Sequence, residues 1–182
     1  MRDLNVLDTY GNTFPLILAD MKRYNNRIKL KSESIAEHSF FVAYNILKVG
    51  YDYKIPNEII NEAVAVAITH DYPEVFTSDL PHDCKQRYPA LRQTLSYIEM
   101  EFMRTEMPEL YERYYKLTHE NSLVTLLVDI GDAISVLQFC NRENELGNHT
   151  SDILNISNEI KMRVVVLFEK LKKELEKNAE EQ

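Results

Sequence analysis

The feature that most limits the fold of this chain is the spacing of its apolar residues. No stretch alternates convincingly between apolar and polar residues with the period of two that a half-buried strand shows. The last segment instead repeats apolar residues at helical spacing, in the stripe Ile153, Ile156, Ile160, Val164, Leu167, Leu171 and Leu175. With only 4 Gly and 6 Pro in 182 residues, the sequence predicts an all-α fold, a compact domain of several helices.

Capping and turn residues predict where these helices begin and end. Ser34-Ile35-Ala36-Glu37 is a capping box, and the helix that it begins should run to Val49, with Gly50 as its stop. Asn25-Asn26 is typical of a turn. The other predicted helices cover residues 13–24, 56–71, about four turns from residue 89, a Tyr-rich segment at 110–117, and residues 123–146 and 151–178. Asn121-Ser122 should cap the helix at 123–146, and Gly147 should close it.

Composition narrows the functional classes. The chain is long enough to bury a substantial core as a single domain over residues 1–182. A net charge of −8 argues against a surface that binds long nucleic acids, although a metal ion could still hold a small anionic substrate. Cys84 and Cys140 have no metal-type spacing and indicate no disulfide framework. We see no signal peptide and no apolar run near the roughly 18 residues of a membrane span, so we expect a cytoplasmic protein without a membrane partner.

A polar pair, His70-Asp71, ends the apolar helical run at residues 63–68. Burying an imidazole and a carboxylate side by side costs free energy unless both groups have partners. A divalent metal ion would be a partner for both, because His nitrogen and Asp oxygen are common metal ligands. The alternative from these two residues alone is a solvated helix end at which the pair is incidental.

Further ligands for such a metal ion are expected from other helices. His38 lies one turn inside the helix that follows Ser34, on a largely apolar face, so its side chain should point inward. The remaining ligand should come from a distant apolar helix, and the hydrophobic run at residues 127–137 holds Asp129 and Asp132 one turn apart. Either acid could instead bond a buried Arg or a helix end.

These residues resemble the signature of the HD-domain metal-dependent phosphohydrolases, His…His-Asp…Asp on separate helices. The resemblance is closer to the YfbR-type 5′-deoxynucleotidases and to their phage relatives that act on dNTPs such as dATP. Its motifs span residues 23–147 in the family's order: Arg23-Tyr24, Ala36-Glu37-His38-Ser39, His70-Asp71-Tyr72-Pro73-Glu74-Val75-Phe76-Thr77-Ser78-Asp79-Leu80-Pro81 and Gly131-Asp132-Ala133. The His-Asp pair alone is a weak signal, whereas the extended string through Leu80-Pro81 is specific.

The resemblance implies a metal site and a substrate site. A divalent ion, Co²⁺, Mn²⁺ or Mg²⁺, would bind His38, His70, Asp71 and Asp132. Asp129 is then the less favoured ligand, because Asp132 is the acid that precedes Ala. Arg23 would hold the phosphate, since a guanidinium fork matches phosphate oxygens. Without the resemblance, Arg23 would be read as an exposed surface residue.

Two substrate-contacting positions depart from the family pattern. Tyr24 stands where deoxynucleotidases often carry a larger Trp that crowds a ribose 2′-hydroxyl, so selectivity between ribose and deoxyribose is left open. Ser78 replaces the usual Gly of the loop, which restricts the backbone or adds a hydroxyl near the sugar.

Glu74 and Asp79 would form the acid/base pair. The reaction needs a water made nucleophilic by a metal ion and a proton for the leaving 5′-oxygen. The resemblance gives these tasks to the two acids without dividing them. From the residues alone, Glu74 would be a helix N-terminal acid and Asp79 a turn residue.

Three functions follow as hypotheses. The first is a metal-dependent phosphohydrolase that releases phosphate from (deoxy)nucleoside 5′-monophosphates. The second is a dNTP triphosphohydrolase, in which Lys22, Arg27, Lys29 and Lys31 near Arg23 would accept the β- and γ-phosphates. The third is a non-catalytic nucleotide-binding helical protein. The resemblance also implies a homodimer or a higher homo-oligomer, and the apolar last helix offers a surface for it.

Overall fold

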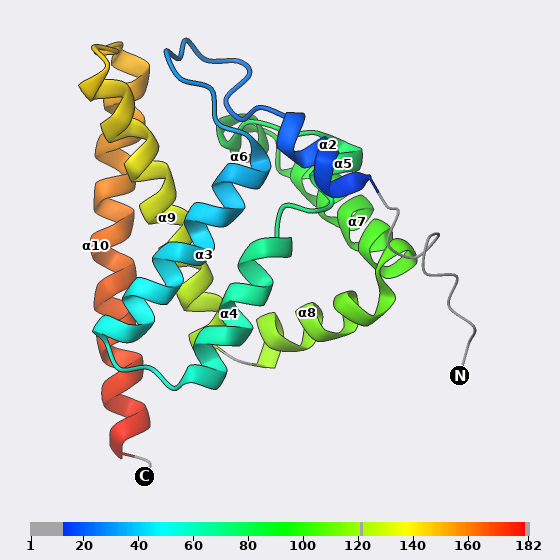
Figure 1. Ribbon diagram of the computed structural model, residues 1–182, viewed down its shortest axis with the longest axis vertical. Helices are drawn as coiled ribbons and strands as arrows, with labels where there is room; N and C mark the ends of the chain where they lie inside the picture. Colours follow the sequence, from blue (N-terminus) through cyan, green and yellow to red (C-terminus); the bar gives the residue numbers. More distant parts are fainter. Residues whose placement is uncertain (1–12, 121, 181–182) are drawn as a thin grey trace.

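The computed structural model describes residues 13–120 and 122–180. Within these residues the chain forms helices and no strand, apart from one isolated bridge between Lys22 and Ser34. The helices (Figure 1) are α2 (Phe14–Asp20), α3 (Ile35–Asp52), α4 (Asn57–Thr69), α5 (Glu74–Thr77), α6 (His82–Arg87), α7 (Pro89–Glu106), α8 (Pro108–Glu120), α9 (Ser122–Glu145) and α10 (Ser151–Glu180). The all-α prediction is confirmed.

Helix α9 lies at the centre of the hydrophobic core. It packs against α3, α4, α8 and α10, and Figure 1 shows the long α10 beside it. Leu127 and Ile130 of α9 are almost fully buried, together with Val42 of α3, Ala63 of α4 and Leu171 of α10. Burial of these side chains is the main stabilising term, and it fixes α3, α4 and α9 next to one another.

The capping box at the start of α3 forms as predicted. The backbone N–H of Glu37 donates to Ser34 Oγ at 3.1 Å, and the N–H of Ser34 donates to Glu37 Oε2 at 2.7 Å. The predicted stop at Gly50 is wrong, because α3 continues to Asp52. A Cβ at residue 50 would lie 2.6 Å from Cδ1 of Ile60, so this glycine allows α3 and α4 to approach closely.

Other boundaries agree with the sequence to within a turn. Helix α2 ends at Asp20 rather than at residue 24, because Met21 is already extended (ψ 127°). A turn forms at Asn25-Asn26. Gly147, with φ +95°, follows the end of α9 as predicted. Asn121, expected to cap α9, lies outside the described residues.

The composition of α9 contradicts the expectation that no apolar run approaches the length of a membrane span. By length and composition alone, Leu123–Glu145 could cross a membrane, with a mean hydropathy of 1.8 over its most apolar window. The prediction that no apolar run approaches this length is therefore wrong. Half of that window is buried in the fold, because α9 is enclosed by neighbouring helices. A central core helix can have this composition without a membrane.

Gly131 sets the distance between α3 and α9. A Cβ at residue 131 would lie 2.8 Å from the backbone oxygen of Val42 and 2.9 Å from Cγ1 of Ile46. A backbone oxygen has no rotamer through which to move away, so only glycine permits this approach. The approach matters for function, because it places His38 of α3 within 3.3 Å of Asp132, the residue after Gly131.

Gly131→Ala should therefore lower the free energy of unfolding, although alanine is the better helix former. Overpacking of a close helix contact typically costs about 1–3 kcal/mol. Urea unfolding checks this, with Gly50→Ala as the matched control. The added methyl at residue 50 meets the side chain of Ile60 and not a backbone atom. A side chain can shift where a backbone oxygen cannot, so the cost at residue 50 should be smaller. An equal or smaller loss at residue 131 would contradict this explanation of the α3–α9 contact.

Candidate active site

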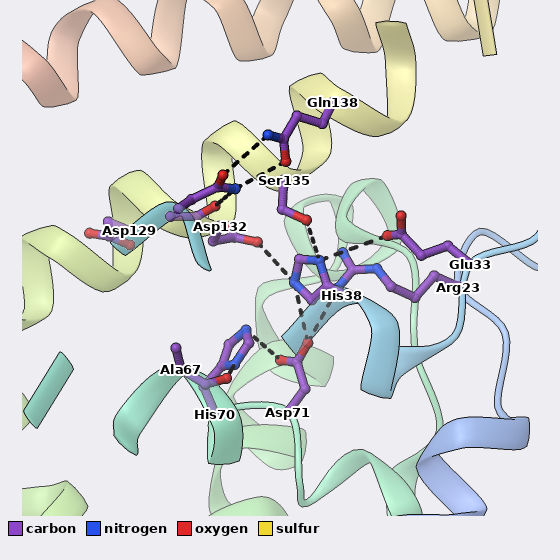
Figure 2. A network of polar contacts seen from close by, with 12 residues as sticks. Arg23, Glu33, His38, Ala67, His70, Asp71, Asp129, Asp132, Ser135 and Gln138 are labelled. Carbon is purple, nitrogen blue, oxygen red and sulfur yellow. Dashed lines mark hydrogen bonds and ion pairs between the residues drawn. The ribbon is translucent and has the colours of Figure 1, made fainter. Parts of the chain in front are cut away.

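Four side chains from three parts of the helical core converge at one point (Figure 2). His38 comes from α3, His70 and Asp71 follow the last residue of α4, and Asp132 comes from α9. The ligand atoms of His38, His70 and Asp132 all lie within 4.8 Å of one another. Asp71 joins them, with Oδ1 3.3 Å from His70 Nε2 and Oδ2 3.7 Å from His38 Nε2. The structure thus brings together the four residues singled out in the sequence.

Both imidazoles present Nε2 to this centre. Nδ1 of His70 donates to the backbone oxygen of Ala67 at 2.7 Å. Because a carbonyl oxygen only accepts, a neutral His70 keeps its lone pair on Nε2. Nδ1 of His38 is paired with Oγ of Ser135 at 3.1 Å, and burial lowers the pKa of His38. These outward contacts orient both rings with Nε2 toward the cluster, and the carbonyl of Ala67 also fixes the tautomer of His70 that binds metal ions.

The two carboxyl groups remain ionised despite their surroundings. Burial opposes ionisation of Asp71, but His70, His38 and Arg23 outweigh it and lower the pKa of this carboxyl. At Asp132 burial is again outweighed, chiefly by His38 and then by Arg23, so the pKa of Asp132 lies well below its usual range. Negative charge is thereby held at the centre of the cluster.

This donor set fits a divalent metal ion. Nε2 of His38 is buried, makes no well-aligned hydrogen bond within the described residues, and lies 3.3 Å from Asp132 Oδ1. Neutral imidazole nitrogens and carboxylate oxygens are acceptors, and their convergence is costly unless a cation or proton lies between them. Two His and two Asp offer the nitrogen and oxygen ligands that suit zinc and related transition metals.

Asp129, the other acid considered in α9, contacts Arg163 rather than a histidine of the cluster. Its Oδ1 lies 3.4 Å from Nη2 of Arg163, and its side chain is 50% exposed. Asp132 also contacts Arg163, through Oδ2 at 3.4 Å, but directs Oδ1 to His38. The geometry therefore favours Asp132 over Asp129 as a metal ligand.

Arg23 and Tyr24 lie beside the cluster in the segment between α2 and α3. Nη1 of Arg23 is 3.3 Å from Oδ2 of Asp71, and the Arg23 side chain is only 13% exposed, so Arg23 is not the surface residue of the alternative interpretation. The ring of Tyr24 stacks on Phe139 of α9, with centroids 4.2 Å apart. Both residues line the cavity described below.

Glu74 and Asp79 border the cluster from the α5 region. Glu74 is buried, and its Oε1 lies 3.6 Å from Nζ of Lys85. Burial, together with the charges of Asp71 and Asp79, raises the pKa of Glu74 to about 9. Oδ2 of Asp79 accepts the backbone N–H of Tyr24 at 3.2 Å. Glu74 thus favours its protonated form, while Asp79 holds the segment that carries Arg23.

Ser78, the residue in place of the family's glycine, has a strained backbone. Its φ of 67° and ψ of 157° lie in a region that is essentially restricted to glycine. The side chain is exposed, and Ser78 is not among the residues that line the cavity. The substitution therefore acts on the loop between Glu74 and Asp79 through backbone strain.

Ser78→Gly should raise the free energy of unfolding by about 1 kcal/mol, since the strain removed exceeds the extra entropy of glycine in the unfolded chain. Ser96→Gly, in the exposed interior of α7, is the matched control and should lower stability by about 0.5 kcal/mol. Thermal or urea unfolding measures both. A loss of stability at residue 78 would show that its backbone is not strained.

A cavity of about 460 Å³ opens onto the cluster, within the range of roughly 300–1,000 Å³ that small-molecule sites occupy. Its lining includes Arg23, Asp71, Glu74, Asp79 and Asp132. Of the four basic residues considered for a triphosphate, Lys22, Arg27, Lys29 and Lys31, the lining includes Arg27. Nζ of Lys29 instead donates to the backbone oxygen of Tyr24, and that of Lys22 donates to Ala19.

The residues of the site that the sequence did not predict include Glu33, Lys85, Ser135 and Arg163. Ser135 could have been found, because it lies one turn beyond Asp132 and so shares its helix face. Arg163 follows Ile156 and Ile160 at spacings of seven and three, which places it near the buried stripe of α10. No local signal distinguishes Glu33 or Lys85.

Known proteins resemble the chain over most of its length. Residues 15–179 match the family model described as 5′-deoxynucleotidase YfbR-like. A 5′-deoxynucleotidase of Photorhabdus laumondii is 26% identical over 130 residues, an alignment that spans 66% of each protein. The chain therefore matches slightly less than two thirds of that relative's length.

Two solved structures share the fold. A cyanophage S-2L HD phosphohydrolase, DatZ, bound to dA and one catalytic Zn²⁺ ion, is 18% identical, with a TM-score of 0.72, over 94% of this chain and 97% of that one. An HD-domain phosphohydrolase from Listeria innocua is 21% identical, with a TM-score of 0.68, over 94% and 88%. At these identities the likeness establishes the fold.

Proposed function

We propose, since this chain belongs to the YfbR-like 5′-deoxynucleotidase family, that it is a metal-dependent phosphohydrolase of (deoxy)nucleoside 5′-monophosphates. The observation that carries the proposal is the convergence of His38, His70, Asp71 and Asp132 beside a cavity that also contains Arg23 and two further acids. Such a set combines metal ligands, a phosphate-binding group and an acid/base pair in one site.

The four converging side chains would hold the ion through Nε2 of each histidine and one oxygen of each aspartate. When bound, a divalent ion supplies positive charge for the phosphoryl oxygens and lowers the pKa of a water. Co²⁺, Mn²⁺ and Mg²⁺ are the predicted ions, and the Zn²⁺ of the cyanophage enzyme adds zinc to the candidates. His70 is oriented for this role by Ala67, and His38 by Ser135.

Arg23 would bind the phosphate. Its guanidinium lies in the cavity wall, already held by Asp71 at 3.3 Å, so little side-chain entropy is lost on binding. Glu74, whose pKa is raised by burial, would hold the proton that the leaving 5′-oxygen takes, and Asp79 would orient the attacking water. This division of the two tasks extends the resemblance, which left them undivided.

The charges of the cavity support a monophosphate. Among the described residues that line it, four are cationic (Arg23, Arg27, Lys85 and Arg163) and five carry carboxyl groups (Asp71, Glu74, Asp79, Asp132 and Glu159). If all nine groups are ionised, the four positive and five negative charges sum to −1, and a divalent ion raises this sum to about +1, which suits a phosphate monoester dianion better than a triphosphate. A triphosphate would bring an excess of negative charge.

The test is to strip the purified protein of metal, reload it with Mn²⁺, Co²⁺, Mg²⁺ or Zn²⁺, and identify the products from dAMP, AMP and dATP. The proposal predicts nucleoside and inorganic phosphate from the monophosphates. Release of triphosphate from dATP, with no phosphate released from dAMP or AMP, would favour the triphosphohydrolase alternative. Tight nucleotide binding without product under every metal would favour the non-catalytic one.

Arg23→Ala should lower kcat/KM by about 10- to 100-fold, because charge-assisted contacts to phosphate are worth roughly 1.5–3 kcal/mol. Bound metal, measured by elemental analysis, should stay near the wild-type level. Arg104→Ala, on the exposed surface of α7, is the matched control and should leave kcat/KM unchanged. Loss of metal in Arg23→Ala would mean that Arg23 serves the metal site.

Cytoplasmic location and self-association remain predictions from the sequence and the family resemblance.

A further inference from the structure

Arg163, outside the family motifs, reaches the metal cluster from α10. Its Nη1 lies 3.4 Å from Oδ2 of Asp132, and its Nη2 lies 3.4 Å from Oδ1 of Asp129. Arg163 also lines the cavity. One guanidinium therefore spans two acids of α9 while facing the space where a substrate would bind.

The two predicted carboxylate ligands have matching surroundings. Asp132 directs Oδ1 to His38 and Oδ2 to Arg163. Asp71 places Oδ1 beside His70, and its Oδ2 lies 3.3 Å from Arg23. In each case an arginine contacts one carboxylate oxygen and the other oxygen faces a histidine of the cluster, and Oδ2 of Asp71 also lies 3.7 Å from Nε2 of His38. Arg163 is thus related to Asp132 as Arg23 is related to Asp71.

The contacts of Arg163 leave its guanidinium able to bind an anion. Its side chain is 42% exposed, and that of Asp129 is 50% exposed, so solvent screens the attraction between them. A guanidinium has five N–H donors, and these two contacts occupy only part of them. An ion pair that only joins α9 to α10 would not need a place in the cavity wall, which Arg163 has.

We propose that Arg163 is a second phosphate-binding arginine, which binds the phosphoryl oxygens together with Arg23, and that Asp129 is the positioning residue that holds it there. The proposal rests on the proposed function, because it assigns a further residue to the phosphate of the same substrate. It also gives Asp129 a role other than metal binding.

The test measures binding of inorganic phosphate to the metal-loaded protein by isothermal titration calorimetry, together with metal content. Arg163→Ala should weaken phosphate binding by about tenfold or more and should retain bound metal. Arg163→Lys should recover part of the affinity, since it restores the charge without the fork. Asp129→Asn should weaken phosphate binding by a smaller factor and should also retain metal. Lys161→Ala, two residues away on α10 and exposed, is the matched control and should bind phosphate as the wild type does.

The proposed role of Arg163 would be overturned by a phosphate affinity that is unchanged in Arg163→Ala, or by a wild-type protein that binds no phosphate. Loss of metal in parallel with loss of phosphate would also overturn it, because Arg163 would then only support Asp132. These outcomes differ from failure of the proposed function. A wild-type protein that binds phosphate but hydrolyses no nucleotide would refute the proposed activity. The effects of the variants on phosphate binding would still test the role of Arg163.

Discussion

Asp132→Ala should lose bound metal and hydrolytic activity together. Asp132 Oδ1 lies 3.3 Å from Nε2 of His38, with the ligand atom of His70 close by, so its removal takes a ligand from the cluster and leaves His38 facing a gap. Loss of residues that only orient metal ligands already costs about 10- to 100-fold in metal affinity or activity, and loss of a ligand itself should cost more. Metal affinity by competition with a chelator, and kcat/KM on the same sample, measure the two effects.

Asp129→Ala is the matched control, one turn away on the same helix. Asp129 is half exposed and contacts Arg163, so this variant should keep its metal and appreciable activity, with at most the smaller loss of phosphate binding expected when Arg163 is no longer held in place. The reverse pattern, with metal lost from Asp129→Ala and retained in Asp132→Ala, would overturn the choice of ligand.

Glu74→Gln should lower kcat by about 10²- to 10⁴-fold, the usual contribution of a general acid or base. Glutamine keeps the size of the side chain and its contact with Lys85 but cannot exchange the proton. Bound metal and thermal stability should change little, because Glu74 is not among the residues of the metal cluster. Steady-state kinetics with saturating metal measure the loss.

Glu99→Gln is the control for a partly buried carboxyl group near the site. Glu99 of α7 accepts a hydrogen bond from Thr77 at 3.3 Å but is not part of the cavity wall, so kcat should hardly change. Wild-type kcat in Glu74→Gln, or an equal loss in Glu99→Gln, would remove Glu74 from the reaction.

The sequence predicted what depends on local rules. The capping box at Ser34 fixed the start of α3, and helical spacing turned His38 inward from it. The apolar runs before His70 and around Asp132 placed His70 at the end of one core helix and Asp132 within another. Each of these inferences needed only one helix at a time.

The errors and omissions depend on how helices pack against one another. Glycine is a common helix stop, yet Gly50 lies inside α3, because only a residue without a side chain leaves room for Ile60 of α4. Arg163 meets Asp132 only because α10 returns beside α9 in a particular register. Register between helices is set by interdigitating side chains, and no local pattern in α10 specifies it.

The most direct test of the metal site is a crystal structure of the protein loaded with Mn²⁺ or Co²⁺, with diffraction data collected at the absorption edge of the metal. The account predicts one anomalous peak per chain, about 2.0–2.3 Å from Nε2 of His38, Nε2 of His70 and one oxygen each of Asp71 and Asp132. A peak elsewhere, or no peak among these four side chains in crystals that contain the metal, would contradict it.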